Sequence, residues 1–212
     1  MSEPKLSTKE KFEIAAQAGL NAIPYIGGSL STLYFGAKEE RKFKRIENLY
    51  ALIRDDFEEF KGRILPLESF DKFKLSALID EINENAENDA IGNKIEYFRN
   101  CFFNILTNQD EEAFDKRKYF IQALSQVTQL EIEILSNLYK AGDGHAYSPK
   151  SEKEDHFDIN QYNGLLERLK SIGFLNSSLN GTLHPGINLS QISAYQISDF
   201  GKEFVAFCLE TA

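Results

Sequence analysis

The chain has 212 residues, of which 42% are hydrophobic and 27% are charged, and its formal net charge is −9. This length and composition exclude a disordered chain and predict one large domain or two small ones, with a buried core. The acidic balance disfavours nucleic acid as a general partner, because a negative surface repels phosphates unless a local basic patch overcomes the repulsion.

An uncharged stretch, Ile14–Ala37, lies near the N-terminus. Upstream of it, Ser7–Glu10 has the spacing of a capping box, which predicts a first helix that ends near Asn21. Pro24 and the Gly27-Gly28 pair then break this helix. The two glycines lack the following Lys-Ser/Thr of a phosphate-binding loop, so a helix break is the favoured interpretation.

The uncharged stretch is long enough to cross a bilayer, because a spanning helix needs about 20 apolar residues. Its Gln, Asn, Ser, Thr, Gly and Pro residues dilute its apolarity, so we expect it to be buried within a helical bundle. A conditional contact with a membrane or a partner is the alternative. The residues proposed for that contact are Ile23, Tyr25, Ile26 and Leu30.

Basic residues follow the uncharged stretch at once: Lys38, Arg41, Lys42 and Arg45. Their spacing of i, i+3, i+4 and i+7 places them on one face of a helix, where they could hold anionic lipid or nucleic acid. Three glutamates lie close by in the sequence. A solvated face with ion pairs is therefore the favoured interpretation.

A long second helix is predicted from Ser29 to about Gly62. Apolar residues recur along it at spacings of three and four, which indicates a single apolar seam. We interpret this seam as a surface that docks a partner or a second copy of the chain. The seam consists of Phe43, Ile46, Tyr50, Ile53, Phe57, Phe60 and Ile64.

Three further helices are predicted from helical periodicity, over about Ser69–Ile82, Ile95–Leu106 and Phe114–Leu124. The polar run Asn83–Asp89 is predicted to be a loop or a frayed helix end. Since strand alternation is missing from this part of the sequence, residues 1–127 are predicted to form an α-helical bundle.

The last 85 residues follow a different pattern. Thr128–Glu131 is a second capping box and predicts a helix, after which Ala141–Asp158 looks irregular. An amphipathic helix is predicted over Asn160–Ile172, with Gly173 as its C-terminal cap. Short strands at Phe174-Leu175 and Ser193–Ile197 follow, and Ser198 is placed to cap a final helix.

This order of elements resembles a winged-helix domain over about 80 residues. The resemblance implies a mainly α fold, in which a winged-helix-like domain with a small β-hairpin, residues 128–212, follows the bundle. In that family a second helix of the core motif lies where this chain has Ala141–Asp158, whose helix signal is poor. Such a resemblance implies fold more strongly than function.

The layout of the chain also resembles the bacterial abortive-infection alpha family. The apolar segment and basic helix over Ile23–Ile46 and the helical region Asn93–Leu124 fit that family's organisation. So do the C-terminal motifs over Leu166–Leu175 and Tyr195–Phe204, which are similar to "LERLGLI" and "Y-x-L-T-x-F-G-x-x-F". This chain departs from the second motif at Ser198, where the family often has Thr. The resemblance implies an association with phage defence and supplies no catalytic residue.

The helix over residues 160–172 carries side chains that could read base edges or contact a partner. Against DNA, residues 128–212 hold 6 Lys or Arg and 11 Asp or Glu, a net charge of −5. Winged helices that bind DNA usually need a basic face, so protein docking is favoured. The candidate contact residues are Asn160, Gln161, Asn163, Arg168 and Lys170.

No cofactor is predicted. Acidic and imidazole side chains do gather in one loop, but their spacing matches no known metal site, and a surface loop is favoured. These residues are Asp143, His145, Asp155, His156 and Asp158.

Residues 1–13 are charged and precede no apolar region with a cleavage site, which argues against a secretory signal. Cys101 and Cys208 lie in helical, apolar settings, so buried free thiols in a reducing cytoplasm are expected. We therefore expect a cytoplasmic protein. Peripheral attachment to the inner membrane is the alternative location.

The favoured hypothesis is a non-enzymatic bacterial protein that binds a protein partner or forms a homo-oligomer, with phage defence as the role that the family resemblance implies. One alternative is a winged-helix transcriptional regulator that binds DNA. A second is a conditional membrane effector that uses residues 14–37.

Overall fold

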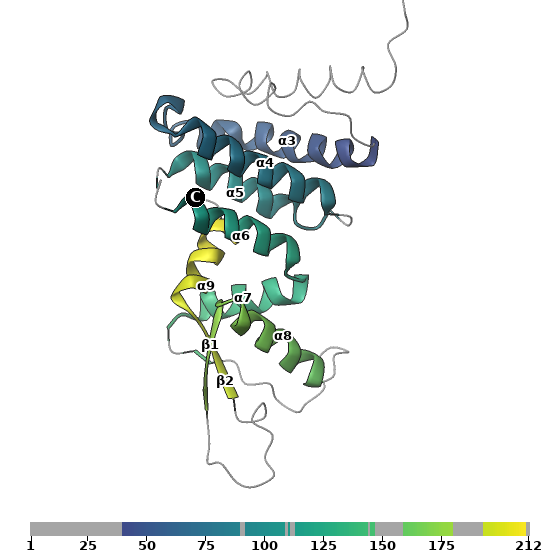
Figure 1. Cartoon of the computed structure of the whole chain (residues 1–212), viewed down its shortest axis with the longest axis vertical. Coiled ribbons are helices and arrows are strands. Elements are labelled where there is room, and N and C mark those ends of the chain that lie inside the picture. Colours follow the sequence, from purple (N-terminus) through teal and green to yellow (C-terminus); the bar gives the residue numbers. More distant parts are fainter. Residues whose placement is uncertain are drawn as a thin grey trace, which may run out of the picture. The chain divides into compact units, whose positions relative to one another are not determined.

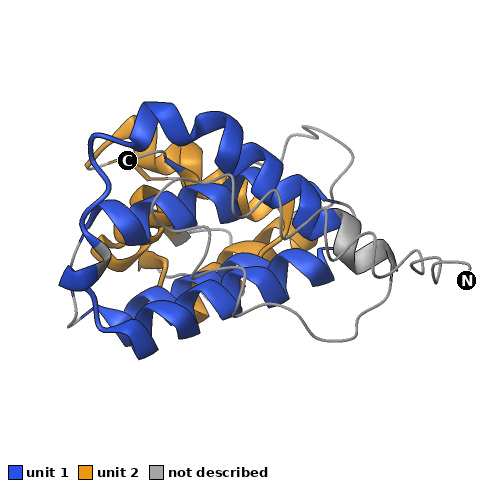
Figure 2. Cartoon of the chain, turned by 90° about the horizontal axis from the view of Figure 1, so that it is seen from above, with its two compact units in different colours: residues 1–126, 210–212 blue, residues 127–209 orange. Residues whose placement is uncertain are grey.

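The computed structural model shows a mainly α-helical protein with a small two-stranded antiparallel sheet near its C-terminus, which confirms the predicted fold class (Figure 1). The chain divides into two compact units, residues 1–126 with 210–212 and residues 127–209 (Figure 2). The sequence placed the division one residue later, after residue 127, and assigned residues 210–212 to the second domain. The structure describes residues 40–89, 92–108, 110, 113–143, 145–146, 159–179 and 193–210.

Unit 1 contains the helices of the predicted bundle. Helix α3 contacts α4 and α5, and α4 also contacts α5 and α6. The predicted helix before Asn21 and the break at Pro24 lie outside the described residues. The elements are α3 (Glu40–Phe60), the short 3-10 helix η1 (Leu67–Ser69), α4 (Lys72–Asn88), α5 (Ile95–Thr107) and α6 (Phe114–Gln126).

The apolar seam of the long helix lies inside unit 1, because its residues from Ile46 to Phe60 are at most 7% exposed. Phe60 stacks on Phe103 of α5 with ring centroids 3.9 Å apart, and Tyr50 meets Phe102 edge to face. The stripe was correctly predicted as apolar, but its interpretation as a docking surface was wrong. Burial against α4 and α5 leaves this part of the seam unavailable to a partner.

Helix α4 continues to Asn88, so the prediction of a loop or frayed end over Asn83–Asp89 was wrong. Tertiary partners stabilise this polar end of the helix. The hydroxyl of Tyr50 donates to Oδ1 of the buried Asn83 (3.1 Å), and the guanidinium of Arg45 donates to the backbone carbonyl of Glu87. A cation at the C-terminal end of a helix also complements the helix dipole.

Unit 2 begins with α7 (Gln129–Ala141) and continues with the amphipathic helix α8 (Ile159–Ser171). The capping box of Thr128 and Glu131 is formed as predicted. Gly173 ends α8 with a φ of +87°, a value that favours glycine, and this confirms the predicted cap.

The rest of unit 2 is a β-hairpin with a terminal helix. β1 (Leu175–Leu179) pairs antiparallel with β2 (Ser193–Ile197), and Leu175 lies opposite Ile197. The short helix α9 (Asp199–Phe204) follows and continues into one π-helical turn, η3 (Val205–Leu209).

The C-terminal motif consists largely of packing residues. Ser198 caps α9, since its Oγ accepts the N–H of Gly201 (2.9 Å) and donates to the carbonyl of Gly173 (2.6 Å). Phe204 stacks on Phe174 with ring centroids 4.3 Å apart. The spacing of this motif therefore has a structural cause within unit 2.

None of the described helices is long and apolar enough to cross a membrane. The uncharged stretch Ile14–Ala37 lies outside the described residues. Cys101 and Cys208 are both buried and free, as predicted.

Candidate functional site

The helix that carries the candidate contact residues, α8, is anchored by its apolar side. Leu166 and Leu169 are fully buried. Asn160, Gln161, Arg168 and Lys170 are exposed, whereas Asn163 is half-buried and its Oδ1 is a buried atom without a hydrogen-bond partner.

Arg168 is held by a buried carboxylate of α7. Its Nη2 lies 3.2 Å from Oε2 of Glu131, a residue with no exposed surface. The same carboxylate oxygen accepts the backbone N–H of Thr128 (2.7 Å) and its hydroxyl (2.9 Å). The Arg168 charge is thus tied to the start of α7, where the capping box fixes the position of its partner.

Lys170 is also paired with a carboxylate. Its Nζ lies 3.3 Å from Oε2 of Glu167, one turn earlier on α8. The hydroxyl of Tyr195 in β2 donates to Oε1 of Glu167 (2.7 Å). This hydrogen bond and Lys170 hold the pKa of the Glu167 carboxyl below its ordinary value, so the carboxylate stays charged at neutral pH.

The face of α8 is therefore nearly neutral. Each of its two cations, Arg168 and Lys170, lies beside a carboxylate of the same unit. Lys and Arg bind phosphates by displacing the counterions condensed on the nucleic acid, and a cation already paired with a carboxylate must first give up that partner. Asn160 and Gln161 are also exposed, and an amide side chain can hydrogen-bond to a protein or to a base edge.

The predicted basic face near the start of α3 is described only in part. Arg45 is half-buried and binds the Glu87 carbonyl, so it has a structural role. Arg41 and Lys42 lie in α3, but their side chains fall outside the description. The remaining candidates lie outside the described residues, namely Lys38, Ile23, Tyr25, Ile26 and Leu30.

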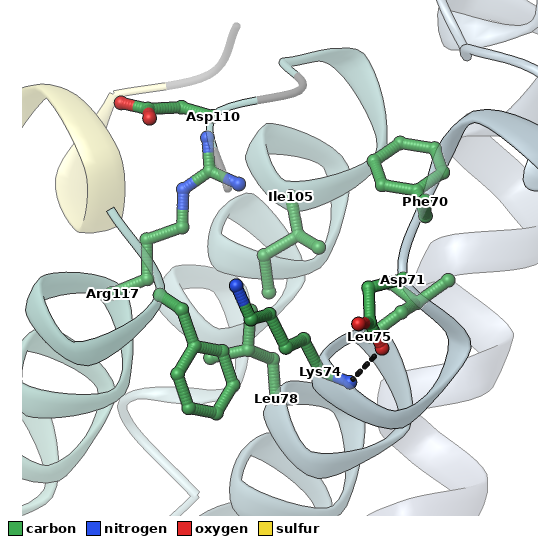
Figure 3. Close-up of a pocket in the computed structure, with 9 residues that line it drawn as sticks. Phe70, Asp71, Lys74, Leu75, Leu78, Ile105, Asp110 and Arg117 are labelled. Carbon is green, nitrogen blue, oxygen red and sulfur yellow. Dashed lines mark hydrogen bonds between the residues drawn. The ribbon is translucent and has the colours of Figure 1, made fainter. Parts of the chain in front are cut away.

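A small pocket in unit 1 is too small for an organic ligand. Its volume of about 30 Å³ suits a water molecule or two. Figure 3 shows Arg117 and Asp110 on one side of it and Lys74 with Asp71 on another. Asp71 caps α4 by accepting the backbone N–H groups of Phe73 and Lys74, and Arg117 donates to the carbonyl of Asn108 (2.9 Å). These charged groups serve local structure.

The loop considered for metal binding is described only at its start. Oδ1 of Asp143 lies 2.5 Å from Nζ of Lys202, and His145 is exposed. Asp155, His156 and Asp158 lie outside the described residues. Within the described ranges, no group of three or more His, Cys, Asp or Glu side chains is placed to hold a metal ion.

A second uncharged stretch was missed in the sequence. The 28 residues from Ser171 to Ser198 contain no Asp, Glu, Lys or Arg. They include both strands, and Ser177, Ser178 and Gln196 are exposed polar side chains without charge. The signal was available, because a run of this length stands out in a chain with 27% charged residues.

Comparisons with protein-family models, curated proteins and solved structures gave no match. The resemblances to a winged helix and to the abortive-infection alpha family therefore stay predictions.

Proposed function

We propose that this chain is a non-enzymatic protein-binding component that acts through unit 2, with the exposed side of α8 and the uncharged hairpin as its contact surface. The observation that carries the proposal is the pairing of Arg168 with Glu131 and of Lys170 with Glu167. These ion pairs remove the positive field that a DNA-binding helix needs.

The hairpin supports a protein partner for a second reason. Protein interfaces are depleted of charged residues at their centres, because desolvating a charge is costly. The segment Ser171–Ser198 offers polar but uncharged groups, including Asn176, Ser177 and Gln196. Such groups can exchange water for hydrogen bonds with a partner without burying a charge.

DNA binding by the whole chain tests the proposal. Labelled duplexes of mixed sequence are titrated at about 20 mM and about 150 mM salt, since electrostatic binding weakens steeply over such a range. We expect no saturable change in fluorescence anisotropy at either salt concentration.

Two lysine variants distinguish a weak DNA-binding site on α8 from nonspecific binding. If the alternative is right, Lys170→Ala lowers affinity and Lys140→Ala, an exposed lysine on α7, does not. Saturable, salt-dependent binding that Lys170→Ala selectively weakens would overturn the proposal.

The wider role in phage defence is proposed from the family resemblance alone. The membrane alternative rests on residues 14–37, which lie outside the described part. Flotation with anionic vesicles that Ile26→Asp abolishes would establish that alternative in place of the protein-binding proposal.

A further inference from the structure

In the part of the chain that the structure describes, no strand pairs with β1 on the side opposite β2. The described sheet has the order β1-β2, so β1 is an edge strand (Figure 1). An edge strand carries a row of unpaired N–H and C=O groups, which is a template for another strand. We propose that β1 pairs antiparallel with β1 of a second copy of this chain.

The register of the hairpin identifies the backbone groups that would make the contact. The N–H of Ser198 donates to the carbonyl of Phe174 (3.0 Å), so these two residues form a hydrogen-bonded pair. Hydrogen-bonded and non-hydrogen-bonded pairs alternate along an antiparallel ladder. Leu175, Ser177 and Leu179 therefore direct their N–H and C=O groups away from β2.

The outer edge of β1 lacks the devices that usually keep strands apart. Proteins protect exposed edges with charged side chains, proline or bulges. The sequence Leu175–Leu179 reads LNSSL and contains neither charge nor proline, and its pairing with β2 is regular along all five residues. In an acidic chain, this neutral segment allows two copies to approach without charge repulsion between the strands.

The sequence of β1 also allows it to pair with β1 of a second copy about a two-fold axis. A two-fold axis through Ser177 places it opposite Ser177 of the second copy and Leu175 opposite Leu179. The three residues whose backbone N–H and C=O groups point away from β2 then lie opposite each other in the two copies. This arrangement allows about six hydrogen bonds across the axis. Polar side chains with no charge at the centre fit a symmetric contact, because like charges directly opposite each other are destabilising.

The inference rests on the proposed function, since it names one occupant of the protein-binding surface. A contact of one short strand buries less than a standard interface, so we expect a weak dimer that dissociates on dilution. If the chain is monomeric, this inference fails and the proposed binding of another protein stands. DNA binding would overturn the proposed function. Dimerisation through β1 is measured independently of DNA, by the sedimentation experiment.

Sedimentation velocity of the full chain over a wide concentration range tests the inference. We expect a monomer–dimer equilibrium for the natural sequence. Ser177→Lys places two ammonium groups opposite each other at the axis and should raise the dimer Kd by about fivefold. Asn137→Lys makes the same charge change at an exposed site on α7, outside the proposed contact surface, and should leave the Kd nearly unchanged.

Two further variants test dimerisation in ways that a folding defect of Ser177→Lys would not affect. Ser177→Pro removes an outward N–H that β2 does not use, so it should abolish dimerisation while circular dichroism stays unchanged. Ser177→Cys should form an intermolecular disulfide under mild oxidation, because opposed residues in a ladder lie within disulfide reach. A monomer at every concentration would overturn the inference, as would a dimer that Ser177→Lys and Ser177→Pro leave intact.

Discussion

Replacing Gly201 with alanine is expected to lower the free energy of unfolding of unit 2 by about 3 kcal/mol or more. A Cβ atom at this position would lie 2.2 Å from the carbonyl oxygen of Phe174 and 3.0 Å from a side-chain carbon of Ile197. The carbonyl is a backbone atom, and it accepts the N–H of Ser198 (3.0 Å), so it has little freedom to move.

A glycine on α8 provides the matched control. Gly164 has no atom within 4 Å of a Cβ built on it. Gly164→Ala should therefore be neutral or stabilise by about 0.5–1 kcal/mol, because alanine is the better helix former. Urea unfolding followed by circular dichroism measures both variants. A Gly201→Ala protein as stable as the natural one would show that α9 does not pack this closely on Phe174.

Replacing Glu131 with alanine is expected to lower the free energy of unfolding by about 2–3 kcal/mol. Its fully buried carboxylate completes the capping box of α7 and binds the guanidinium of Arg168. Removing it takes away a cap interaction worth about 1 kcal/mol and the ion pair with Arg168. The loss from the ion pair stays moderate because the Arg168 side chain is 42% exposed.

Glu133→Ala removes the same charge from an exposed position two residues later on α7, so it should cost less than about 0.5 kcal/mol. A double-mutant cycle with Arg168→Ala should give a coupling of about 1 kcal/mol. Independent effects of the two substitutions would mean that Glu131 does not hold Arg168.

The sequence was sufficient where neighbouring residues determine the structure. The cap at Thr128 depends on Glu131, three residues later, and Gly173 ends α8 through its own backbone conformation. Strand β2 was predicted with its observed bounds, and the cap at Ser198 that follows it is a local signal.

The sequence was insufficient where the partner lies far along the chain. Asn83 and Glu87 looked like loop residues, but Tyr50 and Arg45 from α3 bind them and extend α4. Periodicity likewise identified an apolar seam without revealing that α4 and α5 cover it. A stripe pattern predicts which face is buried and does not identify what buries it.

The candidate contact residues illustrate the same limit. Arg168 was selected for its residue type, and its pairing with Glu131 depends on contact between α7 and α8, which composition does not encode. The uncharged stretch Ser171–Ser198, in contrast, required only a count of charges along the sequence.

Site-specific photo-crosslinking in cells tests the central claim most directly, because it reports the class of molecule that contacts unit 2. A photoreactive amino acid at Gln161 on α8 or Gln196 on β2 samples the exposed surface, and the same group at Glu133 on α7 is the control. We predict protein adducts from Gln161 or Gln196 that Glu133 does not give. Adducts with nucleic acid from Gln161, or with lipid from either position, would contradict a protein-binding role.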